Sequence, residues 1–350
     1  MLNHQQHKTA METNNLQIPS PAMEMAGKVM DSALGIETAA EPEQNPSFIE
    51  SNTQAITLDE LENNCIVPTF SDNTLTIPHQ NFIKTVRSAA ESVFGELTPV
   101  EARVSHPING RTPEAILKRK EDLIPEDTTL FYQRMAWLCK VQSLTRIVNG
   151  QTVHLVIGGV RAYNEDKLYS RRSPEKFKIF VGWQVRVCSN LMLTCDGNSG
   201  SIECLTEADI YQKALLLFQE FNLKKDAELR MLENLHNTRL SEQQFVNIIG
   251  RLRLYEALDS SQKKSLPTVT FGDQAANSAV RGFIDNPNFG LGDEDSISCW
   301  QLMQLFNEAV KSSYIDKWLE RNQNATDFAL GIQAALSGNP SGLAYRWFLD

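Results

Sequence analysis

The chain has 350 residues, of which 41% are hydrophobic and 22% are charged, a composition typical of a globular protein. No segment approaches the roughly 20 consecutive apolar residues that a membrane-spanning helix requires, which excludes a helical membrane protein and predicts no membrane partner. The first residues contain no apolar segment typical of a signal peptide, and the six cysteines follow no disulfide pattern. We therefore expect a cytoplasmic protein.

Charge is unevenly distributed along the chain. The net charge is −10, which disfavours a non-specific nucleic-acid-binding protein. Residues 1–60 hold two basic and nine acidic side chains, whereas residues 80–190 hold 17 basic and 11 acidic ones. Two interpretations stay open: chance unevenness on a solvated surface, or a basic surface for an anionic partner, flanked by acidic segments.

The N-terminal segment predicts a disordered acidic tail over residues 1–56. It is rich in Gln, Asn, Glu and Pro and holds one aromatic side chain, so it buries too little apolar surface to fold. Residues 57–350 are expected to form one domain, sheet-rich over 57–204 and mainly helical over 205–350. Its first helix is predicted from Thr57 and Glu60, which have the spacing of a capping box.

The elements that follow are predicted from local patterns. A strand is expected over residues 65–70, and a turn over 71–74. A helix is expected after Pro78, because apolar residues from Phe82 to Val93 repeat at helical spacing. A short basic helix over 112–120 is expected from an N-cap threonine followed by proline. Residues 131–139 are compatible with a strand or a helix, and their aromatic content favours a strand.

The strongest short-range signal is Asn149 followed by Gly150, between two apolar segments. This pair is typical of a two-residue β-hairpin turn and predicts that residues 144–148 pair with residues 152–157. Gly158 and Gly159 then predict a bulge or a close approach of two backbones.

Residues 177–194 predict one long strand with two unlike faces. Apolar side chains from Ile179 to Leu193 alternate with a second set that includes Lys178, Gln184 and Arg186. This alternation is typical of an antiparallel sheet covered on one side, with a polar, positively charged face on the other.

The C-terminal half is predicted to be helical after a glycine-rich turn at 196–201. Capping boxes predict helices after Thr206 and Ser241, and a further helix is expected from Ser296 or Ser298. A proline- and glycine-containing stretch over 267–295 separates these helices, and a last helix is expected over 326–336. The predicted fold class is α+β: an antiparallel central sheet, with the C-terminal helices packed on its apolar face.

No catalytic motif stands out. The glycines form neither a phosphate-binding loop nor a nucleophile elbow, and the spacing of Cys188, Cys195 and Cys204 differs from that of a zinc site. His154 has no second histidine at ligand spacing, and the acidic residues 293–295 fail the calcium-loop pattern. The sequence therefore predicts no catalytic residues, no metal and no cofactor.

Basic and aromatic side chains between two strands provide a candidate nucleic-acid site. Lysine and arginine on a common face bind phosphates, and exposed rings stack on bases. A solvated loop is the competing interpretation. The predicted contact residues are Arg161, Tyr163, Lys167, Tyr169, Arg171, Arg172, Lys176, Lys178, Arg186 and Asn190.

Residues 185–191 resemble the RVVC-x-NT-L signature of the phage/plasmid-like proteins of mobile genetic elements, except that Leu191 stands where the signature has threonine. Trp300 and Asn307 resemble that family's C-terminal tryptophan–asparagine helix. A closer resemblance, to an uncharacterised bacterial mobile-element family of unknown function, spans roughly 60–350. It is carried by residues 104–107, 157–164, 175–180, 244–245, 250–251, 311–316 and 347–349. It implies a cytoplasmic accessory protein and transfers no catalytic residues.

Three hypotheses remain at this point. The first is a non-enzymatic accessory protein that binds single-stranded DNA and assists annealing. The second is a protein-interaction module for a host or element-encoded protein, with no nucleic-acid binding. The third is an enzyme of unfamiliar type, whose pocket would hold Arg161, Asn164, Arg186 and Asn190. The oligomeric state is left open.

Overall fold

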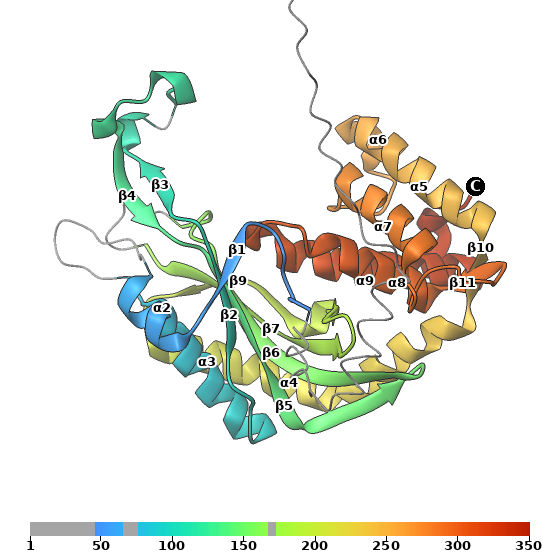
Figure 1. The fold of residues 1–350 in the computed structure, drawn as a ribbon, viewed down its shortest axis with the longest axis horizontal. Helices are drawn as coiled ribbons and strands as arrows, with labels where there is room; N and C mark the ends of the chain where they lie inside the picture. The colour runs from blue at the N-terminus through green and yellow to red at the C-terminus, as the bar shows by residue number, and fades with distance from the viewer. Residues whose placement is uncertain (1–45, 66–75, 116, 167–172) are drawn as a thin grey trace, which may run out of the picture. The chain divides into compact units, whose positions relative to one another are not determined.

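The computed structural model describes residues 46–65, 76–115, 117–166 and 173–350 (Figure 1). Most of the predicted tail, nearly all of the predicted strand at 65–70 and the predicted turn at 71–74 lie outside these residues. Residues 46–56 are folded, which corrects the predicted end of the tail. Phe48 is buried with its ring 5.4 Å from that of Trp318, and Thr53–Ile56 form an edge strand. Burial of Phe48 is the physical reason for this difference.

The described residues contain a seven-stranded antiparallel sheet, which confirms the predicted α+β class. Its strand order is β1-β2-β5-β6-β7-β8, and β9 also pairs with β7. The strands are β1 (Thr53–Ile56), β2 (Glu101–Ser105), β5 (Met135–Val148), β6 (Gln151–Arg161), β7 (Glu175–Val185), β8 (Leu191–Met192) and β9 (Asn198–Cys204). Two small two-stranded sheets pair β3 (Ile108–Arg111) with β4 (Thr128–Tyr132) and β10 (Arg239–Ser241) with β11 (Ser296–Ser298).

The predicted hairpin is confirmed at the β5–β6 turn. Asn149 and Gly150 have φ values of 50° and 77°, the left-handed conformation that this turn requires. Gly158 and Gly159 mark a close backbone approach and no bulge. A Cβ atom on Gly158 would lie 2.2 Å from the carbonyl oxygen of Trp137, and the strands pair in regular register there.

The predicted strand over 177–194 is wrong in its length. β7 ends at Val185, and the chain turns back through residues 186–190 into β8, where Met192 pairs with Trp183. The turn includes Ser189 with a φ of 56°. Because the alternation of apolar and polar residues continues through the turn, the sequence pattern does not distinguish one long strand from a hairpin.

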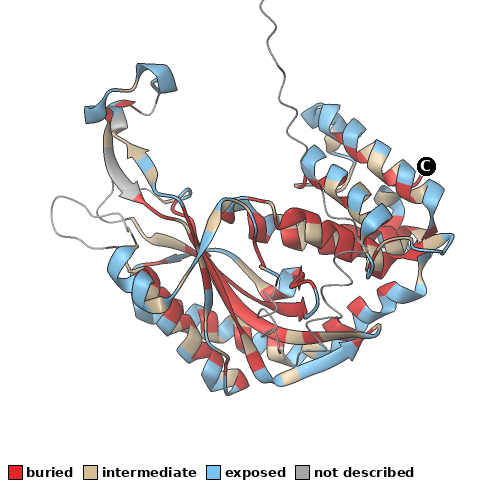
Figure 2. Ribbon diagram, in the orientation of Figure 1, coloured by how far each residue is buried: buried red, intermediate tan, exposed pale blue. Residues whose placement is uncertain are grey.

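Both faces of the central strands are covered, which corrects the predicted open polar face. Helices α3 (His79–Phe94) and α4 (Glu207–Asn234) pack on one face, and α9 (Ile315–Leu336) packs on the other (Figure 1). On the α9 side the Phe180 ring lies 5.7 Å from that of Trp318, and Gln184 is buried. Figure 2 shows buried residues along the middle of the sheet and exposed ones at the β5–β6 hairpin.

Three predicted capping boxes are confirmed, and the helix expected from Ser296 or Ser298 has a fourth box at Ser298. The side chains of Thr57, Thr206, Ser241 and Ser298 each accept a hydrogen bond from the first turn of a helix. They begin α2 (Leu58–Asn64), α4, α5 (Glu242–Ala257) and α8 (Cys299–Val310). None of the described helices is long and apolar enough to cross a membrane.

Other helix predictions need correction. The stretch 267–295 contains α7 (Asp273–Asp285), whose buried stripe is mostly alanine and therefore gave a weak apolar signal. α9 begins at Ile315, well before the predicted start at residue 326. The predicted basic helix at 112–120 is replaced by two 3₁₀ turns. The remaining short helices are α6 (Ser260–Lys263) and the 3₁₀ turns Pro113–Ala115, Lys120–Asp122, Pro125–Asp127, Cys195–Gly197, Leu235–Asn237 and Pro340–Phe348.

Candidate nucleic-acid interface

The predicted contact residues lie at two ends of the sheet. Arg161 is the last residue of β6, whereas the backbone N–H of Arg186 donates to the carbonyl of Thr152, near the start of β6. Arg161 lies nine positions after Thr152 along the strand, about 30 Å at the usual rise. The structure therefore does not bring the predicted residues into one patch. Four of them lie outside the described residues: Lys167, Tyr169, Arg171 and Arg172.

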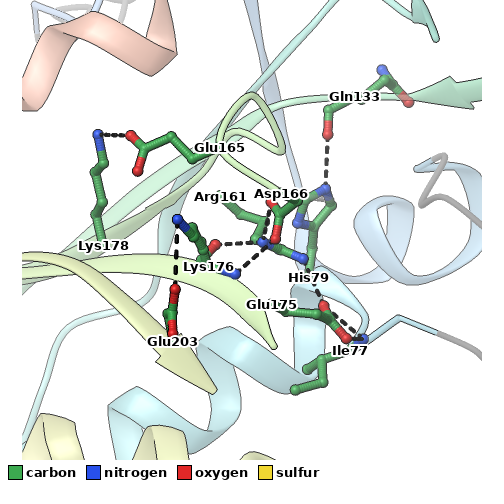
Figure 3. A network of polar contacts seen from close by, with 10 residues as sticks. All are labelled: Ile77, His79, Gln133, Arg161, Glu165, Asp166, Glu175, Lys176, Lys178 and Glu203. Atoms are coloured by element: carbon green, nitrogen blue, oxygen red, sulfur yellow. Dashed lines mark hydrogen bonds and ion pairs between the residues drawn. The ribbon is translucent and has the colours of Figure 1, made fainter. Parts of the chain in front are cut away.

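Arg161 is a buried structural residue with 1% of its surface exposed. Its guanidinium forms ion pairs with Asp166 at 2.9 Å and Glu175 at 2.6 Å (Figure 3). It lies over the rings of Tyr163 and Phe177, 4.1 and 4.2 Å from their centroids. Arg161 thus holds together the two ends of the β6–β7 connection. The prediction that Arg161 and Tyr163 face a partner at the surface is wrong for this conformation, because both are buried.

The same cluster extends to α3 and to the start of β5. Glu175 accepts a hydrogen bond from the backbone N–H of Ile77, and His79 Nε2 donates to the carbonyl of Gln133 at 2.9 Å (Figure 3). Burial lowers the pKa of His79 to about 3, so its ring is neutral at physiological pH. Burial also raises the pKa of Tyr163, which stays protonated. These groups form a packed polar cluster at the base of the β6–β7 connection.

Lys176 and Lys178 are each paired with an acidic side chain. The Nζ atom of Lys178 lies 2.9 Å from Glu165, and that of Lys176 lies 3.6 Å from Glu203. Hydrogen bonds from Lys178 and Ser201 hold the pKa of Glu165 below its ordinary value, so this carboxyl stays charged. An anionic partner must therefore compete with a carboxylate for either lysine.

The opposite end of the sheet exposes an unpaired guanidinium. Arg186 is exposed and has no ion pair with any residue that the structure describes. His154, on the adjacent β6, accepts or donates a hydrogen bond with Thr145 at 3.0 Å. Burial lowers the pKa of His154, and the positive charges of Lys140 and Arg186 lower it further. We call Lys140, His154 and Arg186 the basic strip.

At this end of the sheet α4 covers one face, where Val148 and Val153 are buried, whereas side chains on the other face and in the turn are exposed. Ile147 is 76% exposed on β5, and Val187 is 50% exposed in the turn after β7. Ile147 pairs with Thr152, so it lies on the same face as His154, two residues further along β6. One acid limits the charge, because Lys140 forms an ion pair with Glu101 at 3.2 Å. The basic strip therefore combines positive charge with exposed aliphatic side chains.

Asn190 is buried and positions the turn that carries Arg186. Its Nδ2 donates to the backbone carbonyl of Gln304 at 3.0 Å, and Lys311 donates to the carbonyl of Cys188. Asn190 is therefore not a surface contact. The alternating pattern of residues 177–194 identified Arg186 as a candidate. Lys140 was not identified, because it follows directly after the strand predicted over 131–139. In β6 His154 alternates with the buried Val153 and Leu155, and its partner in β5 is Thr145.

Residues 29–349 match a family model described as "Domain of unknown function, B. Theta Gene description (DUF3871)". The chain belongs to this family. No curated protein and no solved structure matches it. The match confirms the predicted resemblance to a family of unknown function, and it includes both ends of the sheet described above.

In the DUF3871 chain, the four residues proposed for a pocket under the enzyme hypothesis do not lie together. Arg161 and Arg186 lie at opposite ends of β6, so Arg161, Asn164, Arg186 and Asn190 do not line one cavity. Within the described ranges, no group of three or more His, Cys, Asp or Glu side chains is arranged to hold a metal ion. All six cysteines are free thiols.

One buried carboxyl of the DUF3871 chain makes its stability depend on pH. Glu228 of α4 accepts a hydrogen bond from Thr194 Oγ1 at 2.6 Å, yet burial raises its pKa from 4.5 to about 7. A folded-state pKa above the unfolded value stabilises the fold at low pH, and this stability is lost as the pH rises from 4.5 to about 7.

The variant Glu228→Gln is therefore expected to remove most of this loss. The free energy of unfolding of both proteins is measured by urea denaturation from pH 4.5 to 8. We expect the wild-type value to fall relative to that of the variant up to about pH 7, and the two curves to run parallel above it. Glutamine retains an acceptor for Thr194, so the variant should fold. Two curves parallel over the whole range would contradict the assignment.

Proposed function

We propose that this protein is a non-enzymatic accessory protein of a mobile genetic element that binds single-stranded DNA through the basic strip. The observation that carries the proposal is Arg186, an exposed guanidinium without an acidic partner among the described residues. Phosphate binding requires such cations on an open surface. Lys140 and His154 lie close to Arg186, but Lys140 is paired with Glu101 and the lowered pKa of His154 favours its neutral ring, so Arg186 is the main cation of the basic strip. The mobile-element context rests on the resemblance of residues 185–191 to the phage/plasmid-like signature.

The neighbouring side chains suit a flexible strand better than a rigid duplex. Ile147 and Val187 offer exposed aliphatic surface for unstacked bases beside the cations. Arg171 and Arg172, together with Lys167 and Tyr169, are proposed as further contacts from the sequence between β6 and β7. The net charge of −10 repels a polyanion, so binding is expected to depend on these local sites and to weaken with salt.

The variant Arg186→Glu is expected to lower the affinity for a fluorescent oligothymidine about tenfold, since a charge-assisted hydrogen bond contributes roughly 1.5–3 kcal/mol. Anisotropy titrations between 50 and 200 mM salt should also show a slope of log K against log salt that is smaller by about 1. The reason is the loss of one phosphate contact and its counterion.

Arg281→Glu provides the matched control. Arg281 is an exposed arginine on α7 with no ion pair among the described residues, and its replacement changes the net charge equally. It should leave affinity and salt slope nearly unchanged. Equal losses in both variants would mean that only the overall charge matters, and no binding by the wild type at low salt would refute the proposal.

A protein-interaction module is the second candidate, favoured by the solvent face of α4. Leu223 is 88% exposed and Leu216 is 57% exposed, and their spacing of seven residues places them on one side of the helix. Contiguous exposed apolar surface marks partner-binding sites, and we propose this leucine pair as the centre of one. If a host or element-encoded protein co-purifies with the wild type, Leu223→Glu should abolish this whereas Arg186→Glu should not.

A further inference from the structure

A polar cavity of about 370 Å³ lies away from the basic strip, between the sheet and α9. Strands β7 and β9 form one wall, α9 forms the other, and the segment before α7 closes one end. Glu320, Gln323, Asn324 and Asp327 of α9 lie at positions i, i+3, i+4 and i+7, and Leu319 precedes them, so a single helix face lines the cavity. On the other walls the argument rests on Glu165, Lys178, Asn198 and Thr270.

The amide side chains of the wall are bonded to one another and to the backbone. Asn198 Nδ2 donates to Gln323 Oε1 at 2.7 Å, and Gln323 Nε2 donates to Asp327 at 3.2 Å. Asn324 accepts from the backbone N–H of Thr270 at 2.8 Å. These bonds join β9, α9 and the segment before α7. The wall is therefore connected by its own hydrogen bonds, without a ligand.

The lining side chains that lack a cationic or hydrogen-bonding partner among the described residues offer oxygen atoms as acceptors. Lys178 is the one cation among the lining residues, and it is already paired with Glu165 (Figure 3). Asp327 has no cationic partner among the described residues, and its burial raises its pKa. Glu320 has only an exposed pair with Lys317 at 3.5 Å. The buried hydroxyl of Thr270 has no hydrogen-bond partner within the described ranges. The cavity thus lacks the positive charge and the donors that would satisfy its wall.

We propose that this cavity binds a small aliphatic diamine or polyamine. An ammonium group donates three hydrogen bonds, which suits Asp327, Glu320 and the Thr270 hydroxyl. Leu319, the apolar side chain of the lining, offers a contact for the methylene chain. The volume lies within the usual range of small-ligand sites. This site is separate from the basic strip, so it does not depend on the proposed DNA binding.

Titration calorimetry with spermidine and putrescine at 150 mM salt tests the proposal. We expect one saturable site in the full chain, and an affinity at least tenfold lower in Asp327→Asn, the change expected when a charge-assisted contact of roughly 1.5–3 kcal/mol is lost. The asparagine side chain is uncharged, so burial does not penalise this variant, and circular dichroism should show an intact fold. Glu320→Gln should weaken binding less, because Glu320 is more exposed.

Asp285→Asn is the control for charge alone. Asp285 is exposed at the end of α7, and the substitution changes the net charge by the same amount. It should bind spermidine like the wild type. Magnesium chloride at equal charge should not displace the amine. Absence of binding at millimolar spermidine, equal binding by Asp327→Asn, or complete displacement by magnesium would overturn the proposal.

Discussion

Replacing Arg161 with leucine is expected to lower the free energy of unfolding by about 3–5 kcal/mol, the usual cost of removing one partner of a buried ion pair. The substitution leaves Asp166 and Glu175 without their cation, and it removes the stacking of the guanidinium on Tyr163 and Phe177. Urea denaturation at neutral pH, followed by circular dichroism, measures this loss.

Lys176→Met is the control for this prediction. Lys176 lies in the same region but forms a longer, more exposed pair with Glu203, so its replacement should change stability by less than about 1 kcal/mol. Adding Glu175→Gln to Arg161→Leu should recover part of the loss, because one buried charge is then removed. A loss below about 1 kcal/mol in Arg161→Leu would show that the cluster does not stabilise the fold.

The variant Gly158→Ala is expected to lower the free energy of unfolding by about 2–3 kcal/mol, the upper part of the range for overpacking. The added methyl group would lie 2.2 Å from the carbonyl oxygen of Trp137 and 2.5 Å from the ring of Phe180. The first of these is backbone in a central strand, so the clash is not relieved by rotation of a side chain. Thermal and urea denaturation both report the effect.

Gly250→Ala should have the opposite sign. Gly250 lies inside α5, and a Cβ atom there meets nothing within 4 Å. Alanine favours a helix interior over glycine by up to about 1 kcal/mol, so this variant should be more stable than the wild type. If both variants shift stability in the same direction, the close approach at Gly158 is not the cause.

Local signals were sufficient for helix starts and for the tight turn. The capping residues Thr206 and Ser298 act on backbone groups within the next turn, so a few residues contain all the information needed. The same holds for Asn149 and Gly150, whose left-handed conformations define the β5–β6 hairpin. Gly158 also gave a correct signal, since a close approach requires the absence of a side chain.

The candidate site was predicted less well, because its chemistry depends on partners far apart in the sequence. Arg161 and Arg186 both appeared as basic residues near strand ends. Acids from the β6–β7 connection neutralise Arg161 and neighbouring rings bury it, whereas Arg186 has no such partner among the described residues. Sequence spacing contains no information about these contacts, so it grouped residues that lie about 30 Å apart along the strand.

Composition and short-range patterns were enough to establish an α+β chain with an antiparallel sheet and a helical C-terminal half. Those properties follow from propensity, periodicity and capping, which act over a few residues. Which sheet face is covered, where β7 turns back and which cations stay free depended on packing by distant segments. Trp318 of α9 covers one face and Phe48 packs against it, although 270 positions separate them in the numbering. Burial and charge pairing are properties of such contacts, so they emerge when the chain is folded.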